Sequence, residues 1–562
     1  MRHLRSFFAA AAVAVLLATV AAAGPARGQR AMVATAEPMA TEAAVAVLRD
    51  GGTAADAAIT AAVTLAVTEP YSSGLGGGGF VVGWLEGVDE AYALDCRETA
   101  PAGATDDMFL GSDGRADPAL SRTGALSVAV PGLVRGLWEL HRRHGRLPWP
   151  RLLGPAITAA REGFAVPELL AQRIASAERR GHLDPAARAV FCPDGEPLVR
   201  GDWLRQPDLA RTLEAVAESG PDGFYSGPVA RAIVDAVASG GGVLTARDLD
   251  DYRAVWRDPV RGRYRDHEIV GMPPPSSGGV HIVQMLNILE PFDLAAAGYG
   301  SAAAWHPLLE AMKFAFADRS RFLGDPDHVD VPVAMLVGAE RAAEQRARIR
   351  HDRALDPLQI AGAPTEAGTE HTTHLSIVDP DGNAIAATLT INLSFGAGMI
   401  APGTGVLLND EMDDFAAQPG VPNAFGLVQG ERNAVRPGRR PLSSMSPTIV
   451  LRDGAVEMVT GSPGGSRIIT ATVQTILHVV DFGMDAREAV TVPRVHHQWR
   501  PVTAYCEWYG MSPDTRAALE RLGHRITPRS PMGNVQLILR DRETGGWQGA
   551  SDPRGMGLAA GF

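Results

Sequence analysis

The sequence predicts an α+β fold in which helices cover both faces of a stacked pair of sheets. Before residue 372 the chain is rich in segments with apolar residues at helical spacing, and only short runs such as residues 80–84 and 268–272 resemble strands. From residue 372 onward apolar and polar residues alternate, as they do in strands. The sequence shows no internal repeat. Both helices and sheets must therefore contribute to the core.

The N-terminus has the pattern of a secretory signal peptide. Arg2 and Arg5 precede an apolar run over residues 7–23, which ends in small residues. The alternative is a membrane anchor, but the run is near the lower length limit for crossing a bilayer. No later apolar stretch is long enough to span one. We expect residues 1–24 to be removed, and the mature protein to be soluble and exported, either periplasmic or secreted.

Composition excludes some classes of protein. Of the 562 residues, 46% are hydrophobic and 21% are charged, which is ordinary for a globular protein with a large core. A formal net charge of −12 argues against nucleic acid as the main partner, since that role needs a basic surface. Cys96, Cys192 and Cys506 show no C-x-x-C spacing. We expect three buried thiols, or one optional disulfide and a free thiol.

The helices are predicted from periodicity and end signals. Residues 37–68 form two Ala-rich helices separated by Gly51 and Gly52, and Thr53 with Asp56 resembles a capping box for the second helix. Helical periodicity recurs in the rest of the chain, over residues 127–183, 208–218, 226–239, 302–321, 467–480 and 512–522.

The strands are clearest after residue 372. Residues 373–378 alternate, residues 379–383 (DPDGN) form a strong turn signal, and residues 384–393 predict a returning strand, so the segment is a hairpin. Further strands are predicted at residues 447–451, 456–460 and 535–539.

Three short patterns resemble known functional motifs, but the residues around them do not support those functions. Residues 74–79 satisfy G-x-G-x-x-G, but they follow a helix and open a strand, the reverse of a dinucleotide site, so a tight turn packed on the core is expected. Ser462 lacks the first glycine of a nucleophile elbow. His496 and His497 are adjacent on a predicted strand and point to opposite faces, so no metal site is expected there.

The remaining candidate is Thr372. Residues 353–371 form a polar linker rich in Pro and Gly that leads directly into the first strand of the hairpin. If the bond between His371 and Thr372 were cut, a free α-amino group with a pKa of about 7.7–8.0 would appear next to the threonine hydroxyl. Such an amine is a suitable general base for a weak nucleophile. Taken alone, Thr372 would be interpreted as an ordinary threonine at the start of a strand.

Neighbouring segments favour the catalytic interpretation. Thr390 and Asn392 are expected on one face of the returning strand, close to residue 372. Residues 408–415 form an acidic cluster able to hold a cationic amine, and residues 440–447 offer hydroxyl donors for a carboxylate. Residues 461–467 contain a glycine pair whose N–H groups are suited to an oxyanion hole.

These segments, in this order, resemble the γ-glutamyltranspeptidase (glutathione hydrolase) family of N-terminal-nucleophile hydrolases. The resemblance runs from about residue 31 to the C-terminus and includes residues 70–78, 95–101, 323–327, 495–499 and 550–554. It implies a four-layer αββα sandwich built from two autocleaved subunits, the large one over residues 25–371 and the small one over residues 372–562, which stay associated.

The resemblance also implies roles for individual residues. Thr372 would be the nucleophile of both self-cleavage and catalysis, and Thr390 would orient it. The oxyanion hole is implied at Gly464 and Gly465, the substrate carboxylate clamp at Arg97, Ser443 and Ser444, and the amine-binding side at Asn392, Glu411 and Asp414. The γ-glutamyl group of glutathione and similar compounds would acylate Thr372 and then pass to water or to an amino acid or dipeptide acceptor. No cofactor and no metal are implied.

Residues 419–426 resemble the lid loop of many bacterial members, but Phe425 stands where some of them carry tyrosine. The lid then lacks a polar latch, such as one to Asn392. A cephalosporin or glutaryl acylase of the same fold is an alternative, although its substrates lack the amino group that Glu411 and Asp414 would bind. An inactive exported binding homologue is a second alternative, although it would be expected to lose Thr372, Arg97 or the glycine pair.

Overall fold

Two seven-stranded antiparallel sheets form the centre of the molecule. The computed structural model describes residues 24–360 and 372–562. In spatial order, the first sheet consists of β21 (Leu558–Gly561), β2 (Met32–Thr35), β10 (Thr373–Val378), β11 (Ala384–Thr390), β3 (Gly78–Leu85), β4 (Glu90–Cys96) and β7 (Val255–Arg257). The second sheet consists of β1 (Ala26–Gly28), β20 (Trp547–Ser551), β19 (Gln536–Arg540), β15 (Ala455–Gly461), β14 (Thr448–Arg452), β9 (His267–Gly271) and β8 (Val260–Tyr264).

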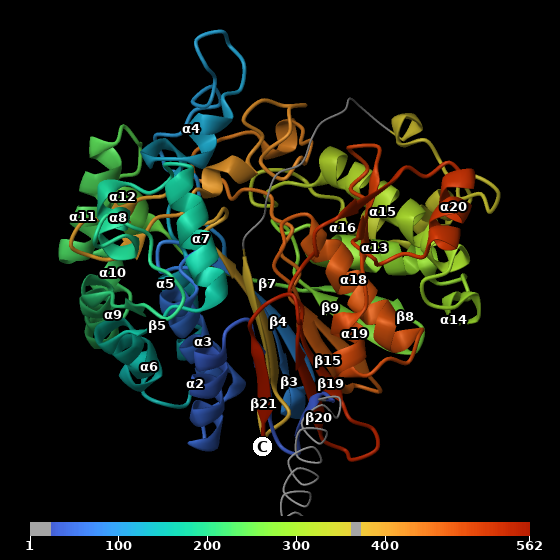
Figure 1. Ribbon diagram of the computed structural model, residues 1–562, viewed down its shortest axis with the longest axis horizontal. Helices are drawn as coiled ribbons and strands as arrows, with labels where there is room; N and C mark the ends of the chain where they lie inside the picture. The colour runs from blue at the N-terminus through green and yellow to red at the C-terminus, as the bar shows by residue number, and fades with distance from the viewer. Residues whose placement is uncertain (1–23, 361–371) are drawn as a thin grey trace, which may run out of the picture.

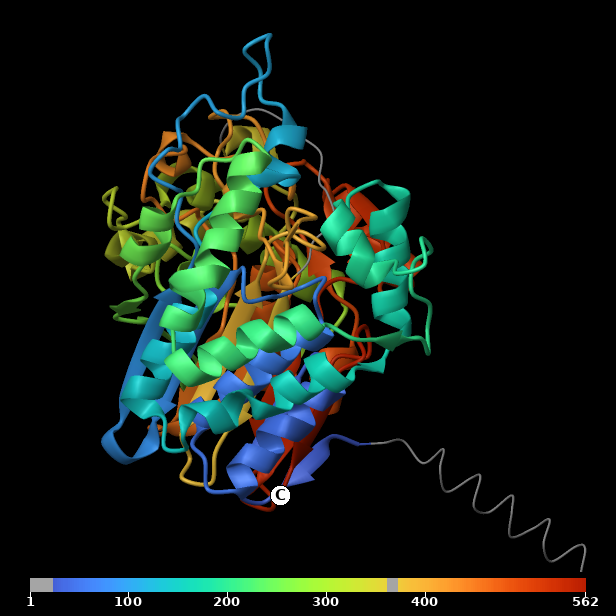
Figure 2. The ribbon, with the colours of Figure 1, turned by 90° about the vertical axis from the view of Figure 1, so that its left-hand side faces the viewer.

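Helices cover the outer face of each sheet, so the predicted four-layer αββα sandwich is confirmed (Figure 1). The first sheet packs against α2 (Pro38–Arg49), α3 (Ala54–Thr68) and α5 (Leu133–His144), with α6 (Trp149–Glu162) and α9 (Pro207–Ser219) outside them. The second sheet packs against α13 (Gly278–Leu289), α18 (Arg467–Val480) and α19 (Ala486–Thr491), with α15 (Ala302–Phe322) beyond α13. Figure 2 shows the helices of the first layer in front of the sheets.

The apolar core follows these layers. One cluster lies between the two sheets and includes Phe80, Ile449 and Ile538, and a larger cluster lies under the helices on each side. Strand β10 is buried throughout. Its alternating polar residue His374 is hydrogen-bonded to Thr388 on the neighbouring strand β11, and its ring packs on Gly461 of the second sheet. Burial lowers the pKa of His374 to about 3, so this histidine is a neutral part of the core.

Local signals predicted the helices and the hairpin well. Helices α2 and α3 separate at Gly51 and Gly52, and the capping box is present, with Asp56 N donating to Thr53 Oγ1 at 3.2 Å and Thr53 N donating to Asp56 Oδ2 at 3.0 Å. The glycine run before β3 is a packing feature, as expected. A Cβ on Gly77 would lie 2.1 Å from the Thr390 carbonyl oxygen, so only glycine lets the two segments approach so closely.

The remaining elements are mostly short and lie around the sandwich. The further helices are α4 (Pro118–Arg122), α7 (Glu168–Arg179), α8 (Pro185–Phe191), α10 (Asp222–Tyr225), α11 (Gly227–Ser239), α12 (Ala246–Asp251), α14 (Leu294–Ala297), α16 (Val333–Leu336), α17 (Ala339–Arg346) and α20 (Pro513–Arg521). The further strands are β5 (Phe164–Ala165), β6 (Trp203–Leu204), β12 (Ile400–Ala401), β13 (Val406–Leu407), β16 (Val495–His496), β17 (Ala504–Glu507) and β18 (Ile526–Arg529).

Two other expectations concern the whole chain. The three cysteines are buried free thiols, which resolves the two alternatives that the sequence left open. No helix in the described ranges combines the length and apolarity that crossing a bilayer requires. The predicted signal peptide, apart from Gly24, and most of the predicted linker, including His371, lie outside the described residues.

Candidate active site

Thr372 lies directly before β10, at the end of the central hairpin. Strand β10 pairs with β11 so that Thr373 is opposite Leu389. Continuing this register by one residue puts Thr372 opposite Thr390, as the hairpin prediction required, and opposite residues in a sheet have Cβ atoms about 4.5–5.5 Å apart. Thr372 is only 8% exposed. Its hydroxyl is therefore held in a restricted site beside Thr390.

The prediction that Asn392 shares a strand face with Thr390 is wrong. Strand β11 ends at Thr390, and Asn392 has a left-handed backbone with φ 74°. The turn is held by two hydrogen bonds, from Asn392 N to Thr390 Oγ1 at 2.8 Å and from Asn392 Nδ2 to the Asp410 carbonyl oxygen at 2.9 Å. Asn392 nevertheless lines the same cavity as Thr372, because the turn brings it back toward the hairpin.

Gly464 and Gly465 lie between β15 and α18, with φ values of 132° and 52° that glycine adopts without strain. Within the described residues, neither backbone N–H has a hydrogen-bond acceptor. Both glycines precede a helix of 14 residues, whose N-terminal end carries a partial positive charge. The segment offers free donors and a favourable field for an oxyanion, and both cavities that contain Thr372 include one of the two glycines.

Arg97 is the centre of a buried ionic cluster. Its two terminal nitrogens donate to Glu411 Oε1 and Asp414 Oδ2, and Nε donates to the Pro441 carbonyl oxygen at 3.2 Å. Glu411 and Asp414 lie on η4 (Glu411–Asp414), 314 and 317 residues from Arg97 along the chain. The predicted carboxylate and amine clamps are therefore one connected network instead of two separate sites.

The environment shifts the pKa of each member of this network. Burial alone would lower the pKa of Arg97, but the carboxylates of Glu411 and Asp414 raise it above its ordinary value. Burial raises the pKa of Glu411 well above its usual range and also raises that of Asp414, while Arg97 opposes both shifts. Glu98 is also buried, with Oε2 3.8 Å from Arg97 Nη1, and burial raises its pKa to about 7. Sequence inspection assigned Glu98 no role.

Ser443 and Ser444 complete a small cavity, called the first cavity below, of about 20 Å³. Ser443 Oγ accepts from Met445 N at 3.1 Å, whereas the buried Ser444 Oγ and Glu411 Oε2 have no hydrogen-bond partner in the part of the chain that the structure describes. Unsatisfied buried polar atoms are costly, so they favour a polar ligand here. The first cavity is lined by Arg97, Thr372, Thr390, Asn392, Glu411, Asp414, Phe425, Ser443, Ser444, Met445, Gly465 and Ile468.

The lid loop is closed over the first cavity. Phe425 is 5% exposed, and its carbonyl oxygen accepts from Gln498 Nε2 at 3.1 Å. Asn423 holds the loop from below, because its Nδ2 donates to Asp414 Oδ1 at 3.2 Å and its Oδ1 accepts from Phe425 N at 3.0 Å. The polar latch that Phe425 lacks is thus supplied by Asn423 instead, and a ligand larger than water enters only if the loop or its side chains move.

Thr372 also lines a second cavity of about 370 Å³. Glu69 lines it and accepts hydrogen bonds from Tyr71 Oη and Thr373 Oγ1, each at 2.7 Å. Burial raises the pKa of Glu69 to about 7, although both hydrogen bonds oppose the shift. The second cavity also contains Arg173 from α7. Sequence inspection missed these residues, and only the glycine-rich motif that follows Glu69 pointed to this region.

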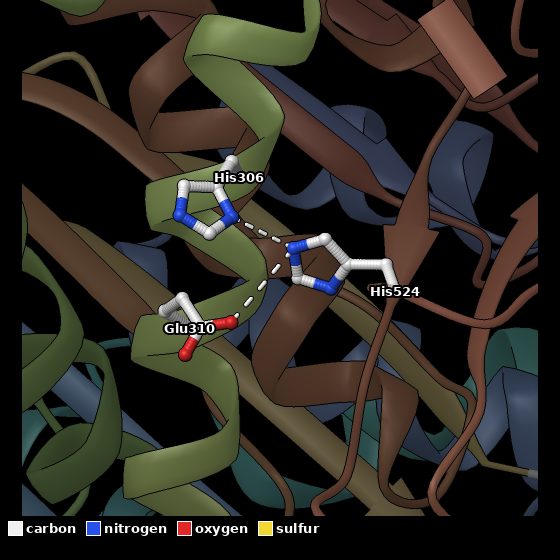
Figure 3. Close-up of side chains that lie close together, drawn as sticks. All are labelled: His306, Glu310 and His524. Carbon is white, nitrogen blue, oxygen red and sulfur yellow. Dashed lines mark hydrogen bonds and ion pairs between the residues drawn. The ribbon is translucent and has the colours of Figure 1, made fainter. Parts of the chain in front are cut away.

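One cluster in the described residues brings together three side chains of types that ligate metals: His306, Glu310 and His524. Figure 3 shows His306 and Glu310 on successive turns of α15, facing His524. The Arg350 carbonyl oxygen accepts from His306 Nε2 at 2.7 Å, so in neutral His306 the lone pair is on Nδ1, 2.7 Å from His524 Nε2. Around a tetrahedral zinc ion with bonds of about 2.0–2.1 Å, two ligand nitrogens lie about 3.3 Å apart. The two histidine nitrogens are closer than this, at the distance of a direct hydrogen bond.

The surroundings of this cluster favour a structural role. Lys313 Nζ donates to Glu310 Oε1 and to the Leu355 carbonyl oxygen, each at 2.8 Å. The Glu310 carboxylate is therefore already paired with an ammonium group. Burial and then Lys313 lower the pKa of His524 to about 2, which keeps the ring neutral. The cluster binds the backbone at Arg350 and Leu355 and so anchors the segment that leads toward residue 360.

Comparison with known proteins identifies similar chains over nearly the whole length. Residues 40–562 match the family model described as Gamma-glutamyltranspeptidase. The chain is 45% identical over 545 residues to a glutathione hydrolase proenzyme of Escherichia coli (strain K12), covering 96% of this chain and 93% of that protein. It is 44% identical over 553 residues to a glutathione hydrolase proenzyme of Pseudomonas sp. (strain A14), covering 96% of each.

Solved structures agree with the fold. A cephalosporin acylase from Bacillus halodurans superposes with a TM-score of 0.85 at 29% identity, covering 96% of this chain and 97% of that chain. The γ-glutamyltranspeptidase of Helicobacter pylori superposes with a TM-score of 0.55 at 39% identity, covering 57% of this chain and 91% of that chain.

Proposed function

The chain belongs to the γ-glutamyltranspeptidase family, and on this basis we propose that it is a proenzyme that cleaves itself before Thr372 and then acts as a γ-glutamyltransferase and glutathione hydrolase. The observation that carries the proposal is the first cavity, which brings Thr372, a glycine of the oxyanion pair and the Arg97 network together. The substrate is glutathione or a similar γ-glutamyl compound, and the acceptor is water, an amino acid or a dipeptide. No cofactor enters the reaction.

The reaction begins with an attack on the γ-carbonyl carbon by Thr372 Oγ1. The hydroxyl proton passes to the free α-amino group of Thr372, and the N–H groups of Gly464 and Gly465 stabilise the oxyanion. The carbon–nitrogen bond then breaks, the proton leaves on the departing amine, and a γ-glutamyl ester of Thr372 remains. Water or an acceptor amine attacks this ester and loses its proton to the α-amino group. The bond from the carbonyl carbon to Thr372 Oγ1 breaks, the proton passes from the α-amino group to Oγ1, and glutamate or a new γ-glutamyl amide is released.

The Arg97 network binds the amino-acid end of the γ-glutamyl group. The α-carboxylate lies against Arg97, Ser443 and Ser444, because a guanidinium and hydroxyl groups donate to its oxygens. The α-ammonium lies against Glu411 and Asp414, with Asn392 beside them. Since the substrate adds one charge of each sign, the buried network keeps its charge balance when the substrate enters.

Cleavage would leave a large subunit over residues 25–371 and a small subunit over residues 372–562. Strand pairing supports their continued association, since β10 pairs with β2, β11 with β3, and β14 with β9 across the proposed boundary. A denaturing gel tests this. We expect two fragments from the wild type and one band near 59 kDa from Thr372→Ala. A variant that is still split at this position would contradict the role of Thr372.

An acylase acting on glutaryl side chains is the second candidate, favoured by the structural likeness to the cephalosporin acylase from Bacillus halodurans. Its substrates lack an ammonium group, so no substrate cation would lie against Glu411 and Asp414. Turnover of γ-glutamyl and glutaryl anilides separates the two. A preference for the glutaryl compound would overturn the proposed specificity, and a chain that stays uncleaved and turns over neither compound would favour the binding homologue.

Export is the last element of the proposal. Residues 1–24 have the signal-peptide pattern described above, and we propose that they direct the chain to the periplasm or the medium. N-terminal sequencing of the mature large subunit is expected to begin close to residue 25. A large subunit that retains its initiator methionine in the cytoplasm would contradict export.

A further inference from the structure

Thr372 lines two cavities, and the Arg97 network accounts for only the first. Under the proposed function, the γ-glutamyl group fills the first cavity, so the amine that leaves, or that later attacks, must reach the carbonyl carbon from another direction. The second cavity meets this requirement, since its lining includes Thr372 and Gly464. Its volume of about 370 Å³ falls within the usual size of small-molecule sites.

The charges that line the second cavity favour an anion. Arg173, Arg467 and Arg554 contribute to the lining, and Glu69 is the one acid among the described residues there. Glu69 is already engaged by Tyr71 and Thr373. Desolvation by burial raises its pKa to about 7, so its negative charge is weakened near neutral pH. The cationic side chains are therefore not balanced by acids within the lining.

Arg173 differs from the other two arginines. Arg554 donates to Glu507 and Asp552, and both carboxylates neutralise it. Arg467 has interactions of its own. The half-buried guanidinium of Arg173 has neither an ion pair nor a hydrogen-bond acceptor among the described residues, and its buried Nε has no partner. Burial lowers its pKa, with Tyr71 opposing the shift, so an anion near this group would relieve an unfavourable environment.

We propose that the second cavity is the site of the leaving and accepting amine, and that Arg173 binds the free carboxylate of that amino acid or peptide. This inference rests on the proposed function. A guanidinium binds both oxygens of a carboxylate, and such a contact orients the amine toward the ester carbonyl at Thr372. The structure thus assigns two carboxylate sites: Arg97 for the γ-glutamyl donor and Arg173 for the acceptor.

The test compares acceptors that differ only in the carboxylate. Transfer from γ-glutamyl-p-nitroanilide is measured with glycylglycine and with glycylglycine amide, for the wild type, Arg173→Met and Arg173→Lys. The wild type is expected to favour the acid by roughly 10- to 100-fold in kcat/KM, as for a hydrogen bond to a charged group. In Arg173→Met the ratio of kcat/KM for the acid to that for the amide falls toward one. Arg173→Lys recovers part of this ratio, because lysine keeps the positive charge but cannot bind both carboxylate oxygens with a planar guanidinium.

A matched control is available on the same helix. Arg179 is exposed and lies at the end of α7, so Arg179→Met removes a positive charge outside the second cavity and is expected to keep the wild-type ratio. The inference is overturned if the wild type does not distinguish acid from amide, or if Arg173→Met lowers both acceptors equally. If the wild type does not hydrolyse the anilide at all, the proposed function fails first, so the two failures are distinguishable.

Discussion

Replacing Glu69 by glutamine tests whether this buried carboxyl sets the pH dependence of stability. Glu69 lies at the end of α3, is 5% exposed, and accepts hydrogen bonds from Tyr71 and Thr373. The substitution keeps the size of the side chain and removes its charge. One hydroxyl keeps donating to the amide oxygen and the other rotates to accept from the amide nitrogen, so the packing of this region is expected to survive.

The magnitude follows from the pKa of Glu69, which burial raises from 4.5 to about 7. A rise of this size corresponds to about 3 kcal/mol, since each pKa unit is worth about 1.4 kcal/mol. Between these two pH values the folded state holds more protons on Glu69 than the unfolded state does, so stability falls as the pH rises. The loss begins near pH 4.5 and is complete above pH 7. Glu69→Gln removes this slope.

The assay is the melting temperature of the processed enzyme between pH 4.5 and 8. For a chain of this length about 1 kcal/mol corresponds to roughly 1 °C, so the difference between Glu69→Gln and the wild type is expected to shift by about 3 °C in favour of the variant over this range. Glu162→Gln, at an exposed position, serves as the control and is expected to show no such shift. A pH-independent difference for Glu69→Gln would refute the reasoning.

Three further predictions follow from other contacts. Arg97→Met leaves Glu411 and Asp414 buried without their cation, so kcat/KM for γ-glutamyl-p-nitroanilide is expected to fall at least about 100-fold, and a smaller loss would argue against the clamp. Asn423→Ala removes the contact between the lid and Asp414 and is expected to raise KM roughly 5- to 10-fold with kcat less affected; an unchanged KM would show that this contact does not control substrate binding. Gly461→Ala would place a Cβ 2.3 Å from the His374 ring and is expected to cost about 1–3 kcal/mol by thermal melting, whereas Gly87→Ala, with no atom within 4 Å, is expected to be nearly neutral.

Several parts of the active site were predictable because their signals are local. The hairpin that carries Thr372 follows from the alternation in β10 and the turn at residues 379–383, and strand register alone then puts Thr372 opposite Thr390. Helix α18 begins and ends where periodicity predicted, one residue after Gly464 and Gly465. In each case hydrogen bonds or apolar spacing within a few residues determine the backbone.

Other parts depend on contacts between distant segments. Asn392 leaves the strand because the chain turns there to bond with Asp410, and no local pattern in residues 384–393 predicts that turn. The pairing of Arg97 with Glu411 joins residues 314 apart, so its geometry follows only from the packing of the two segments. Asn423 replaces the expected lid latch for the same reason.

The sequence by itself predicted the layered fold from local periodicity and turn residues, and its linear motifs, through their resemblance to a family, pointed to Thr372, Gly464, Gly465 and the residues proposed for the clamp. Only the tertiary structure decided that the clamp is a single ionic network, and that Thr372 lines two cavities, the second of which includes Arg173. The physical reason is that burial and electrostatic pairing depend on which segments come together in space. No short stretch of sequence records that information.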